Sequence, residues 1–163
     1  MLSNIAPFFI VEELGPSVAF YVRAGFDVRY SAPAQDPFFA IVGRDETRIF
    51  LKAITGDVLP LPNPIRHHWA PWDAFVSVEQ PDTLAAEFAE ANIAFHKELK
   101  NTDDGLRGFE VRDNDGYVCL RMALILPQKW IPRGTAFSLW ALTTRSAVAG
   151  CGNYLRITVH DKP

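Results

Sequence analysis

The sequence contains a weak internal repeat, and this repeat constrains the fold more than any other feature. An apolar run, an acidic break, a helical pattern and a new strand pattern occur within residues 5–30 and again within residues 73–96. A shift of 67 residues, the separation of Val11 and Val78, superimposes the two copies. The other matched pairs are Glu12 with Glu79, Tyr21 with Phe88, Ala24 with Ala91, Gly25 with Asn92 and Phe26 with Ile93. Because a repeat implies repeated architecture, we expect two similar modules.

The first copy predicts the element order β-α-β-β-β. Ile5–Val11 is a short apolar run typical of a buried strand. Pro16 and the acidic pair before it favour a helix N-terminus, and Gly25 favours the end of that helix. Three further strands are expected at Phe26–Tyr30, Phe38–Val42 and Thr47–Ile54.

The second copy follows a proline-rich stretch, with prolines at positions 60, 62 and 64. This spacing indicates a stiff, extended connector without a helix or strand of its own. After it, the pattern predicts a strand at Asp73–Val78, a helix at Thr83–Ala91 and a strand that starts at Ile93–His96.

The segment GLRGFEVRDNDGYVCLRM, residues 105–122, predicts a β-hairpin. Apolar residues alternate with polar ones on both sides of Asp113–Gly116, which has the composition of a turn. Gly116 suits a backbone position with positive φ, and the aspartate and asparagine side chains of the turn can accept hydrogen bonds from nearby backbone amides.

Two segments resemble the glyoxalase / bleomycin-resistance / extradiol-dioxygenase family, which has the vicinal oxygen chelate fold. The hairpin is similar to the run G-x-x-x-F-x-x-x-D-P-D-G-N, from which Asn114 and Tyr117 depart. The segment LGPSVAFYVRAGFDV, residues 14–28, is similar to the opening D-L-x-x-S-x-x-F-Y-x-x-x-L-G-F-x-V, with Glu13 in place of Asp and one residue missing before Gly25. The resemblance covers residues 5–122. It implies an α+β fold in which two β-α-β-β-β modules form facing half-barrels around a cleft.

We therefore divide the chain into a first module (1–55), a connector (56–71), a second module (72–122) and a C-terminal tail (123–163). The tail does not resemble the family. Alternation at Leu155–Val159 suggests one late strand. The tail could cover a module edge, extend a dimer contact, or be an unselected read-through from a shifted frame.

The composition excludes several classes of protein. Of 163 residues, 48% are hydrophobic and 21% are charged, which is ordinary for a globular chain. A net charge of −3 gives no basic field for nucleic acid or an anionic membrane. No apolar stretch approaches the ~20 residues of a membrane span, and the start lacks the pattern of a signal peptide. Cys119 and Cys151 have no metal-type spacing and are expected to be buried thiols in a reducing cytoplasm.

The resemblance implies metal-ligand positions at Ala6, Phe50, Asp73 and Leu120. Three of these residues have no donor atom for a divalent cation. The alternative site is Asp73 with His67 and His68, which could bind Zn, Ni, Fe or Mn weakly, although exposed loop histidines are the simpler interpretation. His96 and His160 lie on expected strands without a partner in sequence. We expect no cofactor.

No motif for catalysis is present. The sequence has no G-x-S-x-G nucleophile motif and no phosphate-binding glycine loop. The carboxylate pairs Glu12/Glu13, Asp103/Asp104 and Asp113/Asp115 all fall in expected turns or caps, where we expect them to be solvated.

Aromatic residues are the remaining candidates for a binding site. Trp69 and Trp72 lie where the connector enters the second module, and there they could stack on a planar ligand. Phe38, Phe39 and Phe50 lie on strands expected to line the first half-barrel, although core packing explains most phenylalanines. The predicted ligand-binding residues are Phe38, Phe50, Trp69, Trp72 and Asp73.

In relatives without metal ligands, the resemblance implies a homodimer of the bleomycin-resistance type that sequesters a small molecule. We expect a planar ligand, and a cationic one if Asp36, Asp73 and Glu79 lie near the cleft. One alternative is a glyoxalase-like metal-dependent lyase, isomerase or dioxygenase. A purely structural module with the same fold is another.

Overall fold

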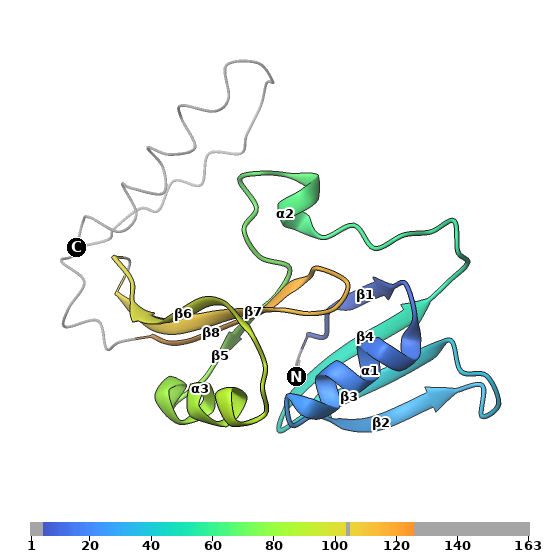
Figure 1. Cartoon of the computed structure of the whole chain (residues 1–163), viewed down its shortest axis with the longest axis horizontal. Helices are drawn as coiled ribbons and strands as arrows, with labels where there is room; N and C mark the ends of the chain where they lie inside the picture. The colour runs from blue at the N-terminus through green and yellow to red at the C-terminus, as the bar shows by residue number, and fades with distance from the viewer. Residues whose placement is uncertain (1–4, 104, 126–163) are drawn as a thin grey trace, which may run out of the picture. The chain divides into compact units, whose positions relative to one another are not determined.

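The computed structural model describes residues 5–103 and 105–125 of the chain. Cys151, His160 and the strand expected at Leu155–Val159 lie outside these residues, as does most of the tail. The elements in chain order are β1 (Phe8–Val11), α1 (Leu14–Arg23), β2 (Asp27–Ala32), β3 (Phe39–Arg44), β4 (Thr47–Ala53), α2 (Asn63–Arg66), β5 (Phe75–Ser77), α3 (Pro81–Glu90), β6 (Phe95–Asn101), β7 (Leu106–Arg112) and β8 (Val118–Ile125) (Figure 1). No helix of the described residues is both long and apolar enough to cross a membrane.

The strands form two four-stranded sheets with the same topology. The first has the order β1-β4-β3-β2 and the second the order β5-β8-β7-β6. In each sheet the first strand pairs in parallel with the last, and the other pairs are antiparallel. Helices α1 and α3 each have ten residues and begin at Leu14 and Pro81, which are separated by the shift of the sequence repeat. The predicted α+β fold of two β-α-β-β-β modules is confirmed.

The connector differs from the prediction. We expected no element between Gly56 and the second module, but α2 forms one helical turn there. Pro62 precedes this turn and Pro64 lies within it, where a missing backbone N–H costs no intrahelical hydrogen bond. The three prolines therefore permit a short helix as well as an extended chain, and the expectation of a wholly extended connector was wrong.

The core lies on the helix side of each sheet. In β1, buried Phe9 and Val11 alternate with exposed Phe8, as the two-residue period of a strand requires. Helix α1 buries one stripe against the first sheet, consisting of Leu14, Ser17, Phe20 and Tyr21. Helix α3 buries Pro81, Ala85 and Phe88 against the second sheet.

The turn between β7 and β8 holds the two modules together. The carboxylate of Asp113 accepts backbone N–H bonds from Asp115 (3.0 Å) and Tyr117 (2.9 Å), and Gly116 has φ of 89°, as predicted. The other oxygen of Asp113 accepts a hydrogen bond from the Tyr21 hydroxyl on α1, at 2.7 Å. The Asp113 side chain is therefore buried, with 6% of the residue exposed, and the expectation of a solvated carboxylate was wrong.

Three other residues of the same turn also bond to the first module. Asp115 accepts hydrogen bonds from the backbone N–H of Glu12 (2.8 Å) and from the Ser17 hydroxyl (2.5 Å). The Tyr117 ring stacks on Phe9 with 4.4 Å between centroids, and its hydroxyl donates to the backbone oxygen of Ile10 at 2.8 Å. The amide group of Asn114 donates to the backbone oxygen of Pro16 at 3.0 Å. These contacts place one turn of the second module over the start of α1.

Burial raises the pKa of Asp113 to about 6, and the nearby charge of Asp115 acts in the same direction. The hydrogen bonds from Tyr21, Tyr117 and Asp115 act to lower that pKa without offsetting the burial. In the unfolded chain an aspartate has a pKa near 3.9. Because the folded-state pKa is the higher one, the stabilisation linked to this carboxyl is full below about pH 4 and is lost as the pH rises through about 6.

Replacing Asp113 by Asn should remove this pH dependence. A difference of about 2 pKa units corresponds to roughly 3 kcal/mol of stability, so the variant should gain on the order of 2 kcal/mol relative to the native chain between pH 4 and pH 7. Urea unfolding of both proteins at several pH values measures the difference. A difference in unfolding free energy that does not change with pH would contradict the assignment.

Candidate ligand-binding site

The face of the first sheet that α1 does not cover consists mainly of aromatic rings. The strand register places Phe8, Phe50, Ile41 and Tyr30 in one row across all four strands. The ring of Phe39, from the neighbouring row, lies 6.4 Å from that of Phe8, 5.9 Å from that of Phe50 and 6.1 Å from that of Tyr30. We call Phe8, Tyr30, Phe39 and Phe50 the aromatic face.

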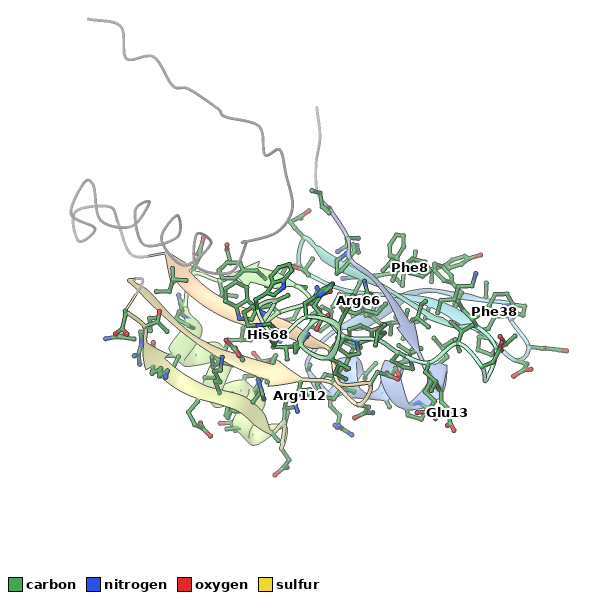
Figure 2. The ribbon with its side chains drawn as sticks, turned by 90° about the horizontal axis from the view of Figure 1, so that it is seen from above. Phe8, Glu13, Phe38, Arg66, His68 and Arg112 are labelled. Carbon is green, nitrogen blue, oxygen red and sulfur yellow. The ribbon has the colours of Figure 1, made fainter. Side chains whose placement is uncertain are left out.

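Much of this face is accessible. Phe8 and Tyr30 are 52% and 53% exposed, whereas Phe39 and Phe50 are half-buried between them. Phe38, which precedes β3, is 51% exposed, and the Lys52 ammonium lies 5.9 Å from the centre of its ring. Figure 2 labels Phe8 and Phe38 on the first sheet. A set of exposed rings in mutual contact is a surface that can stack on a planar molecule.

The corresponding face of the second sheet has a different composition. The backbone register places Phe75, Glu110 and Lys97 in one row across it. The Trp72 ring lies 6.4 Å from that of Phe75. We call Trp72, Phe75, Lys97 and Glu110 the mixed face, because it combines aromatic rings with an ion pair.

Glu110 is buried on this face, and two side chains compensate its charge. The indole N–H of Trp72 donates to Oε1 at 3.0 Å. The ammonium of Lys97 donates to Oε1 at 3.2 Å and lies 3.0 Å from Oε2, although within the described residues Oε2 accepts no well-directed hydrogen bond. A buried carboxylate is expensive without such partners. The ion pair therefore fixes the orientation of Trp72 as well as that of Lys97.

His96, for which the sequence gave no partner, lies beside Arg112. Its Nε2 atom is 3.3 Å from the Arg112 guanidinium. Burial lowers the pKa of His96, and the positive charge of Arg112 lowers it further.

The five predicted site residues do not form one site. Phe50 belongs to the aromatic face and Trp72 to the mixed face, whereas Phe38 precedes β3, with its ring beside the Lys52 ammonium. Trp69 is 69% exposed on the connector, where its ring stacks on that of His67 at 5.1 Å. The two tryptophans therefore have different neighbours, in spite of their proximity in sequence.

The Asp73 carboxylate accepts backbone hydrogen bonds that connect two segments of the chain. One carboxylate oxygen accepts the backbone N–H of Asn63 at 2.6 Å, and the other accepts the backbone N–H of Val118 at 2.8 Å. These bonds tie the connector to the start of β8. Because both oxygens are engaged by amides, Asp73 is a poor candidate for contact with a ligand or a metal ion.

Three of the four expected metal-ligand positions, Ala6, Phe50 and Leu120, have no donor atom for a divalent cation. Across the sheets, Phe8 pairs with Phe50 and Phe75 pairs with Arg121. Phenylalanine has no donor atom, and a permanently protonated guanidinium does not coordinate a cation. Among the side chains described, no group of three or more His, Cys, Asp or Glu lies close enough to hold a metal ion. The residues at these positions do not fit a divalent cation.

Four residues of the two faces were not predicted from the sequence: Phe8, Tyr30, Glu110 and Lys97. Alternation along β1 carried a signal for Phe8, because buried Phe9 and Val11 leave it on the opposite face. Glu110 and Lys97 gave no signal, since they are 13 positions apart and meet only through the register of β6 and β7.

Comparisons with known proteins identify the fold. No protein-family model and no curated protein matches the sequence. Solved structures do match. TioX from Micromonospora sp. ML1 aligns with a TM-score of 0.59 and 19% identity, over 76% of this chain and 99% of TioX. A bleomycin-binding protein complexed with bleomycin aligns with a TM-score of 0.58 and 16% identity, over 76% of this chain and 98% of that protein.

An enzyme aligns as well. Lactoylglutathione lyase from Agrobacterium tumefaciens has a TM-score of 0.52 and 15% identity, over 79% of this chain and 96% of the enzyme. Identities this low establish a shared fold and do not distinguish a binding protein from an enzyme. Together with the two β-α-β-β-β modules, the comparisons show that this chain has the glyoxalase / bleomycin-resistance / extradiol-dioxygenase fold, the vicinal oxygen chelate fold.

Proposed function

We propose that the protein is a small-molecule-binding protein of the bleomycin-resistance type, which holds a planar ligand against aromatic side chains without a metal ion. The aromatic face carries this proposal. Its rings lie on a sheet whose other side is already covered by a helix, so they contribute to binding surface more than to the core. Contiguous apolar surface of this kind marks interaction sites in globular proteins.

The chemistry of the strand positions supports binding over metal-dependent catalysis. Ala6, Phe50 and Leu120, three of the four positions where the resemblance implies metal ligands, offer no nitrogen or oxygen donor. One neighbour in fold is a bleomycin-binding protein in complex with bleomycin. A cleft lined by rings, with a few fixed polar groups, suits a planar organic molecule.

We further propose that two copies form a homodimer in which the aromatic face of one copy lies opposite the mixed face of the other. An isologous twofold arrangement would cover both faces of each copy at once. The resulting cleft would have rings on one wall, and Trp72, Phe75 and the Glu110–Lys97 pair on the other. Exposed Phe8, Tyr30 and the 42%-exposed Phe75 give each copy an apolar surface to bury.

The charge of the ligand is less constrained than its shape. Of the three acidic residues expected to favour a cation, Asp73 accepts two backbone hydrogen bonds and Glu79 lines a groove outside both faces. On the mixed face, the carboxylate of Glu110 is neutralised by Lys97. The proposal therefore rests on a planar ligand and not on a cationic one.

Truncation of Phe50 or Trp72 to alanine should weaken binding of bleomycin, used as the first planar probe. A stacking contact contributes ~0.5–1.5 kcal/mol, so each dissociation constant should rise roughly 2- to 10-fold. Isothermal titration calorimetry measures this without relying on Trp72 as the fluorophore. Leu59→Ala is the matched control, because Leu59 is 62% exposed on the connector. Equal losses in all three variants, or no binding of any planar compound in a thermal-shift screen, would refute the proposed site.

Replacing Tyr30 by Asp should convert the dimer into a monomer, because the change places a charge within the apolar surface of the interface. Sedimentation velocity should show twice the chain mass for the native protein and the chain mass for the variant. Val22→Asp is the control, since Val22 is 48% exposed on α1, away from the aromatic face. A monomeric native protein, or a monomeric Val22→Asp variant, would argue against this interface.

Metal analysis of the purified protein tests the metal-free part of the proposal. We expect less than stoichiometric Zn, Ni, Fe and Mn after dialysis, because three of the four positions where the resemblance implies ligands have no donor atom. One equivalent of a metal that resists dialysis would instead favour a lyase, isomerase or dioxygenase.

A further inference from the structure

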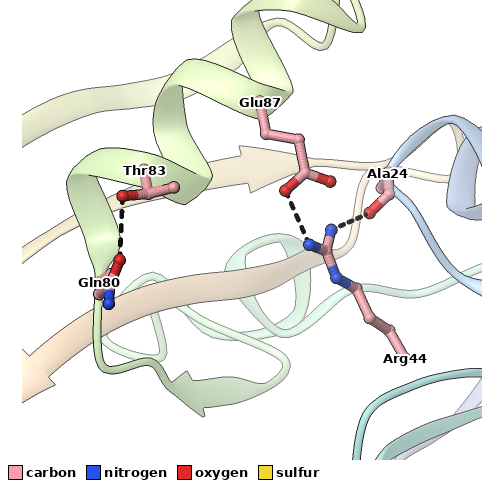
Figure 3. Close-up of polar contacts among 5 residues, drawn as sticks. All are labelled: Ala24, Arg44, Gln80, Thr83 and Glu87. Carbon is pink, nitrogen blue, oxygen red and sulfur yellow. Dashed lines mark hydrogen bonds and ion pairs between the residues drawn. The ribbon is translucent and has the colours of Figure 1, made fainter.

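A groove with a volume of about 610 Å³ lies outside the aromatic and mixed faces. One wall is the turn between β3 and β4 in the first module. The other wall is the end of β5 and the first two turns of α3 in the second module. Figure 3 shows its polar contacts: Arg44 reaches Glu87 on α3 and the backbone oxygen of Ala24, and Gln80 bonds to Thr83.

The internal repeat shows what could fill such a groove. A shift of 67 residues places Val76 on Phe9 and Ser77 on Ile10. In the first module, the space beside Phe9 and Ile10 is filled by Tyr117. Its ring stacks on Phe9, and its hydroxyl donates to the backbone oxygen of Ile10. At the second-module positions, the equivalent space is the groove.

The difference follows from the lengths of the two turns. In the second module the last paired residues before and after the turn are Arg112 and Val118, which leaves Tyr117 and four other residues between them. In the first module they are Arg44 and Thr47, which leaves only Asp45 and Glu46. The shorter turn has no residue that corresponds to Tyr117. An aromatic ring is therefore supplied from within the chain at one site and is missing at the other.

The groove combines apolar and acidic side chains. Val76, Val78 and Leu84 are half-buried along it, whereas Asp45 and Glu79 are exposed at its edge. The positive end of the α3 dipole amounts to about half a charge and does not offset two carboxylates.

Its one lining cation among the described residues, Arg44, is held by other groups. The guanidinium lies 2.8 Å from Oε2 of Glu87 and 2.9 Å from the backbone oxygen of Ala24. The hydrogen bond to Glu87 raises the pKa of Arg44. A Cβ added at Gly25 would lie 2.6 Å from Nη1 of Arg44, so the side chain packs directly on bare backbone. Because Arg44 is paired with Glu87, the charge that a ligand meets in the groove is that of Asp45 and Glu79, which is negative.

We propose that this groove binds a small aromatic amine, with its ring against Val76 and Leu84 and its ammonium group near Asp45 and Glu79. The ring would take the place that Tyr117 occupies in the other half of the repeat. The backbone oxygen of Ser77, equivalent to that of Ile10, would accept a hydrogen bond from a ring hydroxyl. This site is separate from the two sheet faces and does not depend on the function proposed above.

Tyramine is the probe, because it combines a phenol ring with a primary amine. In two-dimensional ¹⁵N–¹H spectra of the full chain, it should cause saturable shifts of the amides of residues 45–47 and 76–80. The anion 3-(4-hydroxyphenyl)propionate, similar in size but opposite in charge, should bind at least ten times more weakly. Equal binding of the two probes, no saturable shift, or shifts confined to the aromatic and mixed faces would overturn the proposal.

Three variants test whether tyramine binds in the groove. Thr83→Trp should fill the groove and weaken tyramine binding at least tenfold, whereas Ala89→Trp, at an exposed position of α3 that does not line the groove, should leave it unchanged. Glu79→Gln should weaken it about threefold, because one carboxylate is lost. Thr83→Trp should not alter bleomycin binding, which separates this site from the sheet faces. An equal effect of the two tryptophan variants would overturn the assignment.

Discussion

The hydrogen bond between the Tyr21 hydroxyl and the Asp113 carboxylate lies at the centre of the contact between the modules. It connects a helix of the first module to a turn of the second, over a sequence separation of 92 residues. The same carboxylate orders its own turn, and the ordered turn presents Asp115 and Tyr117 to the first module. Because the carboxylate is buried, its charge opposes folding near neutral pH, and the hydrogen bonds it accepts compensate only part of that cost.

Each sheet has one face committed to its helix, and this leaves the opposite faces available for function. The two available faces differ in chemistry, in spite of equivalent positions in the repeat. The first is a continuous surface of rings, whereas the second centres on the ion pair between buried Glu110 and exposed Lys97. In a twofold arrangement of two copies, each of these unlike faces would lie opposite the other. The chemical difference between the two faces would thus give a cleft between two copies one aromatic wall and one mixed wall.

The same divergence affects the contact between modules. A turn of five residues fills the space over the start of α1, whereas a turn of two residues leaves a groove at the equivalent place beside α3. These two places are equivalent in the repeat. The longer turn fills one of them as a contact between the modules, and the shorter turn leaves the other as a groove. The Arg44–Glu87 ion pair then bridges the modules where the longer turn is missing.

Much of the fold was determined by the sequence alone, because local signals mark its elements: the proline in the first turn of α1, the glycine after that helix, the alternation along the strands and the turn that ends at Gly116. The repeat extended these signals to two modules. The candidate site was predictable only in part, at Phe50 and Trp72. Tertiary structure decided the rest. Burial of Asp113, the amide contacts of Asp73 and the pairing of Glu110 with Lys97 all arise between residues far apart in sequence, and a register or packing contact cannot be read from local pattern.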